Sequence, residues 1–300
     1  MRCWAPQPCW WRWSSNSDFF RGTLAILARS AAWVCLLALL VAPGTPVYPA
    51  DQAASVSSPS IHAPAANQHW PDFETYHYEA EWKLWTAGLA TLRLQPGPNG
   101  EKQVYGTADS TGFVSLLYTV RDRFESSFDP KTFCSSQIVK KTEEGFRKRE
   151  TDIHFDYSRG KAVLDEKNLK TNESKHVEND VPSCATDVLS GLYYVGTLPL
   201  QSGSIYSFPL NDGNKTQMVE ASTETREQVK VPAGTFKAVR VQLTSTTPPT
   251  TPQKERGKVW IWYSDDAARI PVQMRARMFW GTITLRLQRI ERTQPSAPAK

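Results

Sequence analysis

The sequence lacks the motifs with which many enzymes hold nucleotides or activate a nucleophile. It contains no glycine-rich phosphate loop, no Gly-x-Ser-x-Gly turn and no Cys-x-x-Cys pair. Histidine, a common acid–base residue and metal ligand, occurs only three times between residues 72 and 292. We therefore expect no cofactor and no metal ion, and the balance of motifs leans away from an enzyme.

One strand carries the only arrangement that resembles a set of metal ligands. Asp152, His154 and Asp156 alternate along it and would project from the same face. A solvated strand face produces the same pattern, and this is the interpretation we favour.

A large excess of charge is also absent. The formal net charge is +5 over 300 residues, and the first 50 residues hold four of the basic groups and one acid. The remainder therefore carries a net charge of only +2, which is not typical of proteins that bind the nucleic-acid backbone. We expect no nucleic-acid partner.

No apolar run reaches the length of a typical membrane-spanning helix. Residues 30–42 are uncharged and follow two arginines, as in a secretory signal, whereas a spanning helix needs about 20 apolar residues. We assign residues 19–50 as a signal peptide or, if uncleaved, a signal anchor that touches the membrane only through residues 22–42. Residues 1–18 are expected to be disordered or to precede the true start of the protein. The remaining chain is expected to be exported.

Cysteine is scarce beyond the export segment, where only Cys134 and Cys184 remain of the five. Two thiols in an oxidising compartment form one disulfide. Closing a loop of about 50 residues would stabilise the fold by about 4 kcal/mol in the chain-entropy model. Two buried free thiols are the alternative.

Large apolar residues are nearly absent from residues 51–71, where Pro, Ala, Ser and Gln dominate. Such a segment buries too little surface to offset its ordering entropy, so we expect a flexible linker. Residues 72–292 are expected to form a single domain. Residues 293–300 are expected to be a disordered tail.

The domain shows the two-residue period of half-buried β-strands. Between residues 76 and 84, aromatic and apolar residues alternate with charged or polar ones. Turns rich in glycine and proline separate such segments and predict an antiparallel meander. Strands are predicted at 76–84, 90–94, 103–108, 120–129, 136–141, 146–157, 161–165, 217–222, 225–231, 236–244, 258–264, 270–279 and 282–291.

A helix is predicted at residues 186–195, where Thr186 or Asp187 can cap the first amides and an apolar stripe follows. We expect it to pack against the sheet. A shorter helix is predicted at residues 112–118, with a turn as the alternative. The fold class is therefore all-β, with one or two short helices and a curved antiparallel sheet that forms an open barrel or roll.

Asp122 is predicted to point inward, because it shares a strand face with Val120, Phe124 and Phe128. An inward carboxylate must find a cation or amide donors, or its pKa must rise until it is neutral. Arg240 is a candidate partner. A buried ion pair that fixes the sheet register is the favoured interpretation, with a catalytic acid or a ligand contact as alternatives.

Tryptophan is abundant in the domain, and Trp260 and Trp262 must share one face of a strand. Aromatic residues on a sheet can line a ligand groove, although they also supply core volume without any ligand. The candidate ligand-binding residues are Trp82, Trp85, Asp122, Phe124, Trp260 and Trp262.

Five blocks between residues 73 and 291 are similar to a known family. They are Tyr78-x-x-x-Trp82 with Ala87-Gly88, then 122–126, 187–194, 231–237 and 260–272. Their order resembles the exported bacterial family called domain of unknown function 3108. The resemblance implies a curved all-β sheet in the periplasm or cell envelope of a Gram-negative-type bacterium, with no assigned activity. It also leads us to expect an arginine after Tyr194-Val195, where this chain has Gly196.

Three functional hypotheses remain open. The favoured one is a non-catalytic module that binds an apolar or lipid-like envelope ligand in a pocket lined by aromatic residues and closed by the helix at 186–195. The first alternative is a structural or interaction scaffold of the periplasm, with a self-filled interior and an envelope protein as partner. The second is an envelope enzyme that uses Asp122.

Overall fold

One antiparallel sheet dominates the described part of the chain. The computed structural model describes residues 61–64, 70–83, 85–246, 258–278 and 281–292. They belong to a unit that contains Ser58–Lys300, and a second unit, Arg12–Ser57, lies outside them. The segments predicted at 1–18, 19–50 and 293–300, and most of the predicted linker, also lie outside the described residues.

The sheet consists of two meanders, β1 to β8 and β9 to β14, joined by pairing of β1 with β14. It has 14 strands, with β8 and β9 at its edges. The strands are β1 (Glu74–Trp82), β2 (Trp85–Pro96), β3 (Lys102–Ser110), β4 (Val120–Phe128), β5 (Ser135–Glu144), β6 (Arg147–Asp156), β7 (Lys161–Asn168), β8 (Ser174–Asp180), β9 (Ile205–Asn211), β10 (Thr216–Val231), β11 (Gly234–Ser245), β12 (Val259–Ser264), β13 (Pro271–Met278) and β14 (Gly281–Arg292).

The predicted all-β fold class is confirmed, and both predicted helices are present as α1 (Gly112–Leu117) and α2 (Val188–Thr197). The alternation in the sequence does not predict β8, which is almost wholly polar, or β9, which contains a proline. It predicts two strands at 217–222 and 225–231, but the structure has one, β10, with a register shift between Thr223 and Arg226. None of the described helices has the length and hydrophobicity needed to cross a bilayer.

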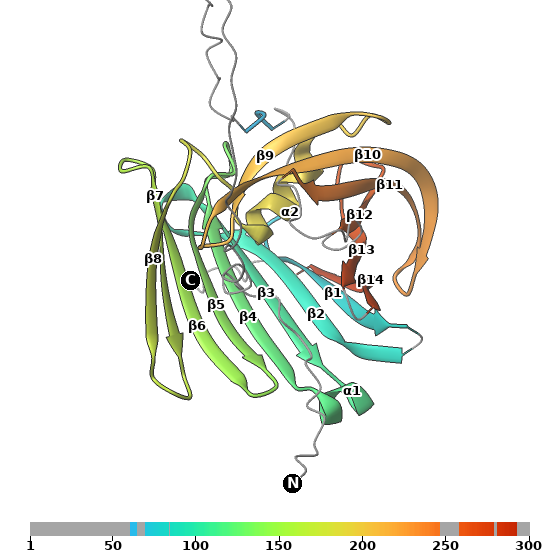
Figure 1. The fold of residues 1–300 in the computed structure, drawn as a ribbon. Helices are drawn as coiled ribbons and strands as arrows, with labels where there is room; N and C mark the ends of the chain where they lie inside the picture. Colours follow the sequence, from blue (N-terminus) through green and yellow to red (C-terminus); the bar gives the residue numbers. More distant parts are fainter. Residues whose placement is uncertain (1–60, 65–69, 84, 247–257, 279–280, 293–300) are drawn as a thin grey trace, which may run out of the picture. The chain divides into compact units, whose positions relative to one another are not determined.

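The two edge strands meet through polar side chains. Asn211 Nδ2 donates a hydrogen bond to Asn179 Oδ1 (2.6 Å), and Asn179 Nδ2 donates to Gly213 O (2.9 Å). Thr216 Oγ1 donates to Asp180 O (2.8 Å). Figure 1 shows the sheet curving round α2. The result is the predicted open barrel or roll, in which side-chain hydrogen bonds connect the two edges of the sheet.

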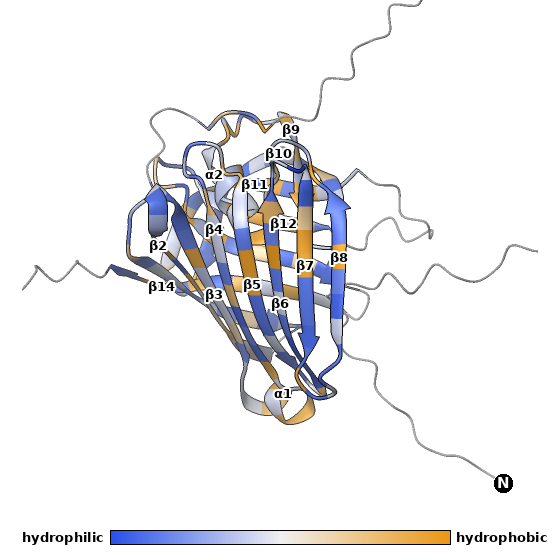
Figure 2. Ribbon diagram, turned by 90° about the vertical axis from the view of Figure 1, so that its left-hand side faces the viewer, coloured by the Kyte–Doolittle hydropathy of each residue, from blue (hydrophilic) through white to orange (hydrophobic). Residues whose placement is uncertain are grey.

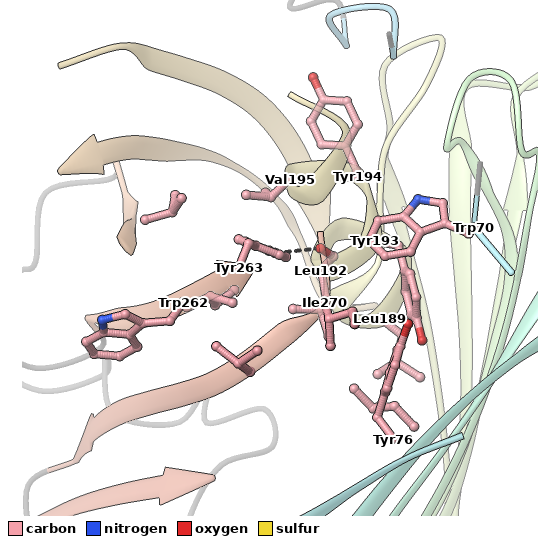
Figure 3. Packing of buried hydrophobic residues seen from close by; sticks show 14 of the residues in the cluster. Trp70, Tyr76, Leu189, Leu192, Tyr193, Tyr194, Val195, Trp262, Tyr263 and Ile270 are labelled. Atoms are coloured by element: carbon pink, nitrogen blue, oxygen red, sulfur yellow. Dashed lines mark hydrogen bonds between the residues drawn. The ribbon is translucent and has the colours of Figure 1, made fainter. Parts of the chain in front are cut away.

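Helix α2 lies on the concave side of the sheet and is buried from Leu189 to Thr197. Tyr263 Oη on β12 donates to Leu192 O (2.6 Å), and Figure 3 shows Tyr263 pointing toward the helix. Burial of a large apolar side chain contributes about 1.5–3 kcal/mol. The helix therefore forms the centre of the main hydrophobic core.

Asp187 both begins α2 and fixes it to the sheet. Its Oδ1 accepts hydrogen bonds from Leu189 N (2.7 Å) and Ser190 N (3.2 Å), as in a capping box. Its Oδ2 accepts from Ser126 Oγ (2.6 Å) on β4 and Ser135 Oγ (2.7 Å) on β5. The residue is only 1% exposed. A single carboxylate thus caps the helix and anchors it to two strands.

The predicted disulfide is confirmed and reinforces this anchor. Cys134 is bonded to Cys184 with a Cα–Cα distance of 5.0 Å. The next residue, Ser135, donates its backbone N–H to Ala185 O (2.9 Å). The bridge therefore joins the start of β5 to the segment that leads into Asp187 and α2.

Gly196, the position that departs from the family pattern, lies beneath the ring of Trp70. A Cβ atom at Gly196 would be 2.8 Å from Cζ2 of Trp70. The same ring meets Tyr193 edge-on, with centroids 5.0 Å apart. Trp70 thus occupies the space that a side chain at position 196 would need.

Candidate functional site

The inner face of the sheet, defined as the face toward α2, changes character along β4–β8. Directly paired residues of antiparallel strands share a face, so the register arranges the inner residues in rows that cross these strands. The row nearest the start of α2 contains Ser126, Ile138, Ile153, Leu164 and Val177. The second contains Phe124, Lys140, Thr151, Glu166 and Lys175, and the third contains Asp122, Thr142, Arg149 and Asn168.

The row nearest the start of α2 is mainly apolar, and the turn between β9 and β10 covers it. Gly213 in this turn has a φ of +97°. A Cβ atom there would lie 2.5 Å from Leu164 Cδ1 and 2.6 Å from Ile153 Cδ1. Glycine is therefore required both by the backbone and by the close packing.

The second and third rows form what we call the polar wall, namely Asp122, Lys140, Thr142, Arg149, Thr151, Glu166, Asn168 and Lys175. All except Asp122 and Thr151 are partly exposed. In Figure 2, β6 and β7 change from orange to blue toward the end at which α1 lies. The inner face therefore passes from a covered apolar surface to an accessible charged one.

A pocket of about 450 Å³ opens on the polar wall, lined by Arg149, Glu166, Asn168, Glu173, Ser174 and Lys175. Arg149 Nη1 lies 3.2 Å from Glu166 Oε1, and Thr151 Oγ1 donates to Glu166 Oε2 (3.3 Å). Lys175 Nζ donates to the amide oxygen of Asn214 (2.8 Å). The pocket therefore presents one ion pair, one ammonium group whose acceptor is neutral, and the carboxylate of Glu173, which accepts a hydrogen bond from Thr171 Oγ1 (2.8 Å).

Lys140 adds a further cation beside this pocket. Its Nζ lies 3.5 Å from the acceptor Asp212 O, a backbone carbonyl. Burial lowers the pKa of Lys140, and the nearby carboxylates of Asp187 and Asp212 oppose that shift. On the second and third rows, Lys140, Arg149 and Lys175 thus surround a single glutamate, Glu166.

Asp122 is buried on the inner face, as predicted, and is 7% exposed. Its Oδ1 accepts a hydrogen bond from Glu143 N (3.2 Å). Burial, together with the charge of Glu144, raises the pKa of Asp122 to about 7, and burial also raises the pKa of Glu144. The predicted ion pair with Arg240 is wrong, because Arg240 pairs with Glu224 at an Nε–Oε2 distance of 2.5 Å. The carboxyl group responds to burial by a raised pKa instead.

Across the concave side, a second surface is apolar. We call it the apolar wall; it consists of the inner-facing residues Ala80, Val259, Met274, Ala276, Ile283 and Leu285. Each is partly exposed. Closer to α2, Tyr78, Ile261 and Leu287 on the same strands are at most 2% exposed. The apolar wall is therefore the part of this inner face that α2 leaves incompletely covered.

The predicted ligand-binding residues do not form one cluster. Asp122 and Phe124 face inward on β4, and Trp82 pairs with Ile283 at the end of the apolar wall. Trp85 is 68% exposed at the β1–β2 turn.

Trp260 and Trp262 alternate with the inward residues of β12 and so lie on its opposite face. The Nε1 of Trp262 donates to Glu227 Oε1 (2.7 Å), and Figure 3 shows this ring pointing away from α2. These two tryptophans therefore do not line the face of the sheet that carries α2. Their part in ligand binding stays a prediction.

Sequence reasoning missed most of the polar wall. Arg149, Glu166 and Lys175 come together because β6, β7 and β8 are neighbours, and β8 is not predicted from the alternation. A partial indication existed, since Arg149 and Thr151 share a strand face with the buried Ile153. Within the described ranges, no group of three or more His, Cys, Asp or Glu residues could hold a metal ion.

Comparison with known proteins relates this fold to uncharacterised domains. A family described as "Protein of unknown function (DUF3108)" matches residues 77–288. No curated protein matches the chain. A crystal structure of a beta-barrel-like protein of domain of unknown function DUF1849 from Brucella abortus has a TM-score of 0.52, with 9% identity, and the match covers 74% of this chain and 98% of that one. At that identity the likeness concerns the fold alone.

Proposed function

Because the chain belongs to the family of proteins of unknown function DUF3108, its function must be argued from its own surfaces, and we propose that it is an exported module that binds an amphipathic, lipid-like molecule. The observation that carries the proposal is the pair of walls, one polar and one apolar, on the concave side that α2 does not fill. Fold alone assigns no function. The walls supply the chemistry on which the proposal rests.

The charges of the polar wall favour a ligand with an anionic head group. Lys175 donates to a neutral acceptor, so its ammonium group can still pair with an anion, whereas Lys140 already lies near the carboxylates of Asp187, Asp212 and Glu166. The ion pair of Arg149 with Glu166 limits the net charge but leaves further guanidinium donors. Hydrocarbon from the same ligand would lie against the partly exposed apolar wall.

Export is supported by two independent features. The segment at residues 30–42 has the pattern of a secretory signal, and the Cys134–Cys184 disulfide is of the kind that persists in oxidising compartments. The resemblance described above favours the periplasm or cell envelope of a Gram-negative-type bacterium.

The test is to purify the protein as it accumulates in cells, extract it with organic solvent and identify any bound lipid by mass spectrometry. The wild type is expected to carry a lipid in stoichiometric amount. Arg149→Gln and Ile283→Asn, one on each wall, are expected to lower the retained amount about tenfold, since each removes a contact worth about 1.5 kcal/mol. The matched controls are Lys167→Gln and Ile205→Asn, which alter exposed residues outside both walls.

A lipid-free wild type that also fails to take up added lipid would overturn the proposal and favour the scaffold hypothesis. That alternative has some support of its own, because α2 and the surrounding aromatic residues already fill part of the interior.

A second candidate function, an envelope enzyme, rests on Asp122. A carboxyl group with a pKa near 7 can act as a general acid or base at neutral pH. Asp122→Asn should then abolish a cellular phenotype while leaving lipid retention and the circular dichroism spectrum unchanged. Loss of lipid retention in this variant would instead assign Asp122 to the binding surface.

A further inference from the structure

Exposed apolar side chains gather at one end of the sheet. Nine large apolar residues are exposed in the described ranges, and seven belong to this group. We call the seven the apolar rim; they are Trp85, Leu89, Phe113, Leu116, Leu117, Phe146 and Leu169. The remaining two, Val188 and Ile205, begin α2 and β9. The clustering separates the rim from isolated exposed side chains, which need no explanation.

Backbone contacts hold the segments of the rim side by side. Before α1, Thr111 N donates to Ala87 O (3.0 Å) on β2, and after it Gly145 N donates to Thr119 O (2.8 Å). Leu169 N then donates to Lys148 O (2.8 Å). Figure 1 places α1 and the turns after β1, β5 and β7 at the same end of the sheet. The rim is therefore one continuous edge.

Packing within the chain covers only part of α1, since Val114 and Ser115 are partly buried and the other four residues are exposed. The helix has no buried residue, and Leu116 and Phe113 are 82% and 68% exposed. Leaving such side chains in water is unfavourable. Phe146, at the neighbouring turn, is 88% exposed. Phe113 and Leu116 project from α1 and Phe146 projects from the turn between β5 and β6. Side chains that project separately in this way fit a fluid lipid layer better than a folded protein with a fixed surface.

Basic residues flank the apolar tips. Lys83 Nζ lies 4.9 Å from the ring centroid of Trp82, and Lys170 Nζ lies 5.6 Å from that of Phe146. Arg147 and Lys148 follow Phe146 directly, and Lys148 Nζ pairs with Glu143 Oε1 (2.8 Å). Trp, Phe and Leu beside Lys and Arg are the composition of surfaces that lie in the interface of an anionic bilayer.

We propose that the apolar rim docks on the surface of an anionic lipid bilayer, with the side chains of α1, Trp85 and Phe146 entering the head-group layer. The proposal rests on the rim alone and does not require a ligand between the two walls. It also gives the chain a membrane contact other than residues 22–42. The row of Asp122 and Arg149 lies a few residues from the rim, so docking would bring the polar wall close to the membrane.

The test uses the full chain and hydrogen–deuterium exchange measured by mass spectrometry, because the readout is specific to each segment whether or not another segment binds the membrane. Phosphatidylglycerol vesicles are expected to slow exchange in residues 111–118 and 145–149 about fivefold or more. Phosphatidylcholine vesicles are expected to slow it less, because the Lys and Arg side chains of the rim then meet no anionic head group. Residues 201–206, which include Ile205, are expected to be unaffected.

Leu116→Ser with Leu117→Ser is expected to abolish the slowing, and Ile205→Ser, at a position about as exposed as Leu117, is expected to preserve it. Vesicle-bound protein with unchanged exchange at 111–118 would overturn the proposal. Slowing at 111–118 that appears without vesicles as the protein concentration rises would also overturn it, in favour of a contact between two copies of the chain.

Discussion

The concave side of the sheet has two halves that differ in how completely they are filled. In the half occupied by α2, Tyr78, Ile261, Tyr194 and Leu287 are at most 2% exposed. In the half toward α1, the same strands present partly exposed residues such as Ile283 and Met274. We call these the helix-filled half and the open half. The proposed ligand would lie against these incompletely covered residues of the open half.

The two halves also differ in their polar groups. In the helix-filled half, the Asp187 carboxylate meets four donors at 2.6–3.2 Å, as a buried charge requires. In the open half, Asp122 is held by one backbone N–H and has a raised pKa. The first carboxylate has hydrogen-bond donors on both of its oxygens, whereas the second has one backbone donor and a pKa raised to about 7.

Replacing Asp187 is expected to have the largest effect, because it would detach the helix that distinguishes the halves. Asp187→Ala removes the cap and the acceptor of Ser126 Oγ, and it leaves Ser135 Oγ with Ser190 Oγ as its side-chain partner. We expect a loss of about 4 kcal/mol in the free energy of unfolding, measured by urea denaturation. The control, Asp156→Ala, removes an exposed turn cap and should cause a much smaller loss; equal losses would contradict the role given to Asp187.

Asp122→Asn is expected to act in the opposite direction. In the folded chain the pKa of Asp122 is about 7, against 3.8 for an ordinary aspartate. At a pH between these two pKa values, Asp122 holds a proton in the folded state and has lost it in the unfolded state. The contribution of this residue to stability is therefore greatest below about pH 4, falls as the pH rises, and becomes level above about pH 7.

The variant lacks this dependence. Its free energy of unfolding, minus that of the wild type, should therefore rise by on the order of 3 kcal/mol between pH 4 and pH 8. Urea denaturation at both pH values measures the change, with Asp180→Asn as an exposed control. A wild-type advantage that grows between pH 4 and pH 8 would show that the carboxylate is stabilised in its charged form.

Removing the disulfide tests whether the anchor of α2 depends on the covalent tie beside it. Cys134→Ala with Cys184→Ala is expected to lower the free energy of unfolding by about 4 kcal/mol, measured in urea without reductant. The wild type in a reducing buffer should lose a similar amount. If reduction changes nothing, the bridge has no part in holding the helix-filled half.

Gly213→Ala probes the boundary between the covered row and the polar wall. The new Cβ would meet Leu164 and Ile153 at a positive φ, and we expect a loss of about 2 kcal/mol. Gly203 has a φ of +83° and nothing within 4 Å of its Cβ position, so Gly203→Ala should cost only about 1 kcal/mol of backbone strain. Thermal unfolding compares the two, and a smaller loss at Gly213 would mean that the turn does not pack on the sheet.

The helix-filled half could largely be predicted from the sequence, whereas the open half could not. Alternation in β1 and β14 and the cap at Asp187 are local patterns, and each predicts its element directly. The polar wall depends instead on the register of strands distant in sequence. Its edge strand β8 lacks alternation because its inner residues Lys175 and Asn179 are polar, and they meet partners on the turn after β9.

Trp260 and Trp262 also show that a local sequence pattern does not predict an arrangement set by distant parts of the chain. The period places Trp260 and Trp262 on one face correctly, but it does not tell which face is concave. That choice is made by Tyr263, which bonds to α2. Gly196 is likewise explained only by the approach of Trp70, more than 100 residues earlier in the chain.

The most direct test of the open half as a binding surface is photo-crosslinking with a phospholipid that carries a diazirine at the end of its acyl chain, followed by peptide mapping. Labelling is expected at residues 258–263 and 272–287, which include every residue of the apolar wall except Ala80, and little labelling is expected at α2. Crosslinks confined to residues 111–118, or spread evenly over the exposed surface, would contradict it.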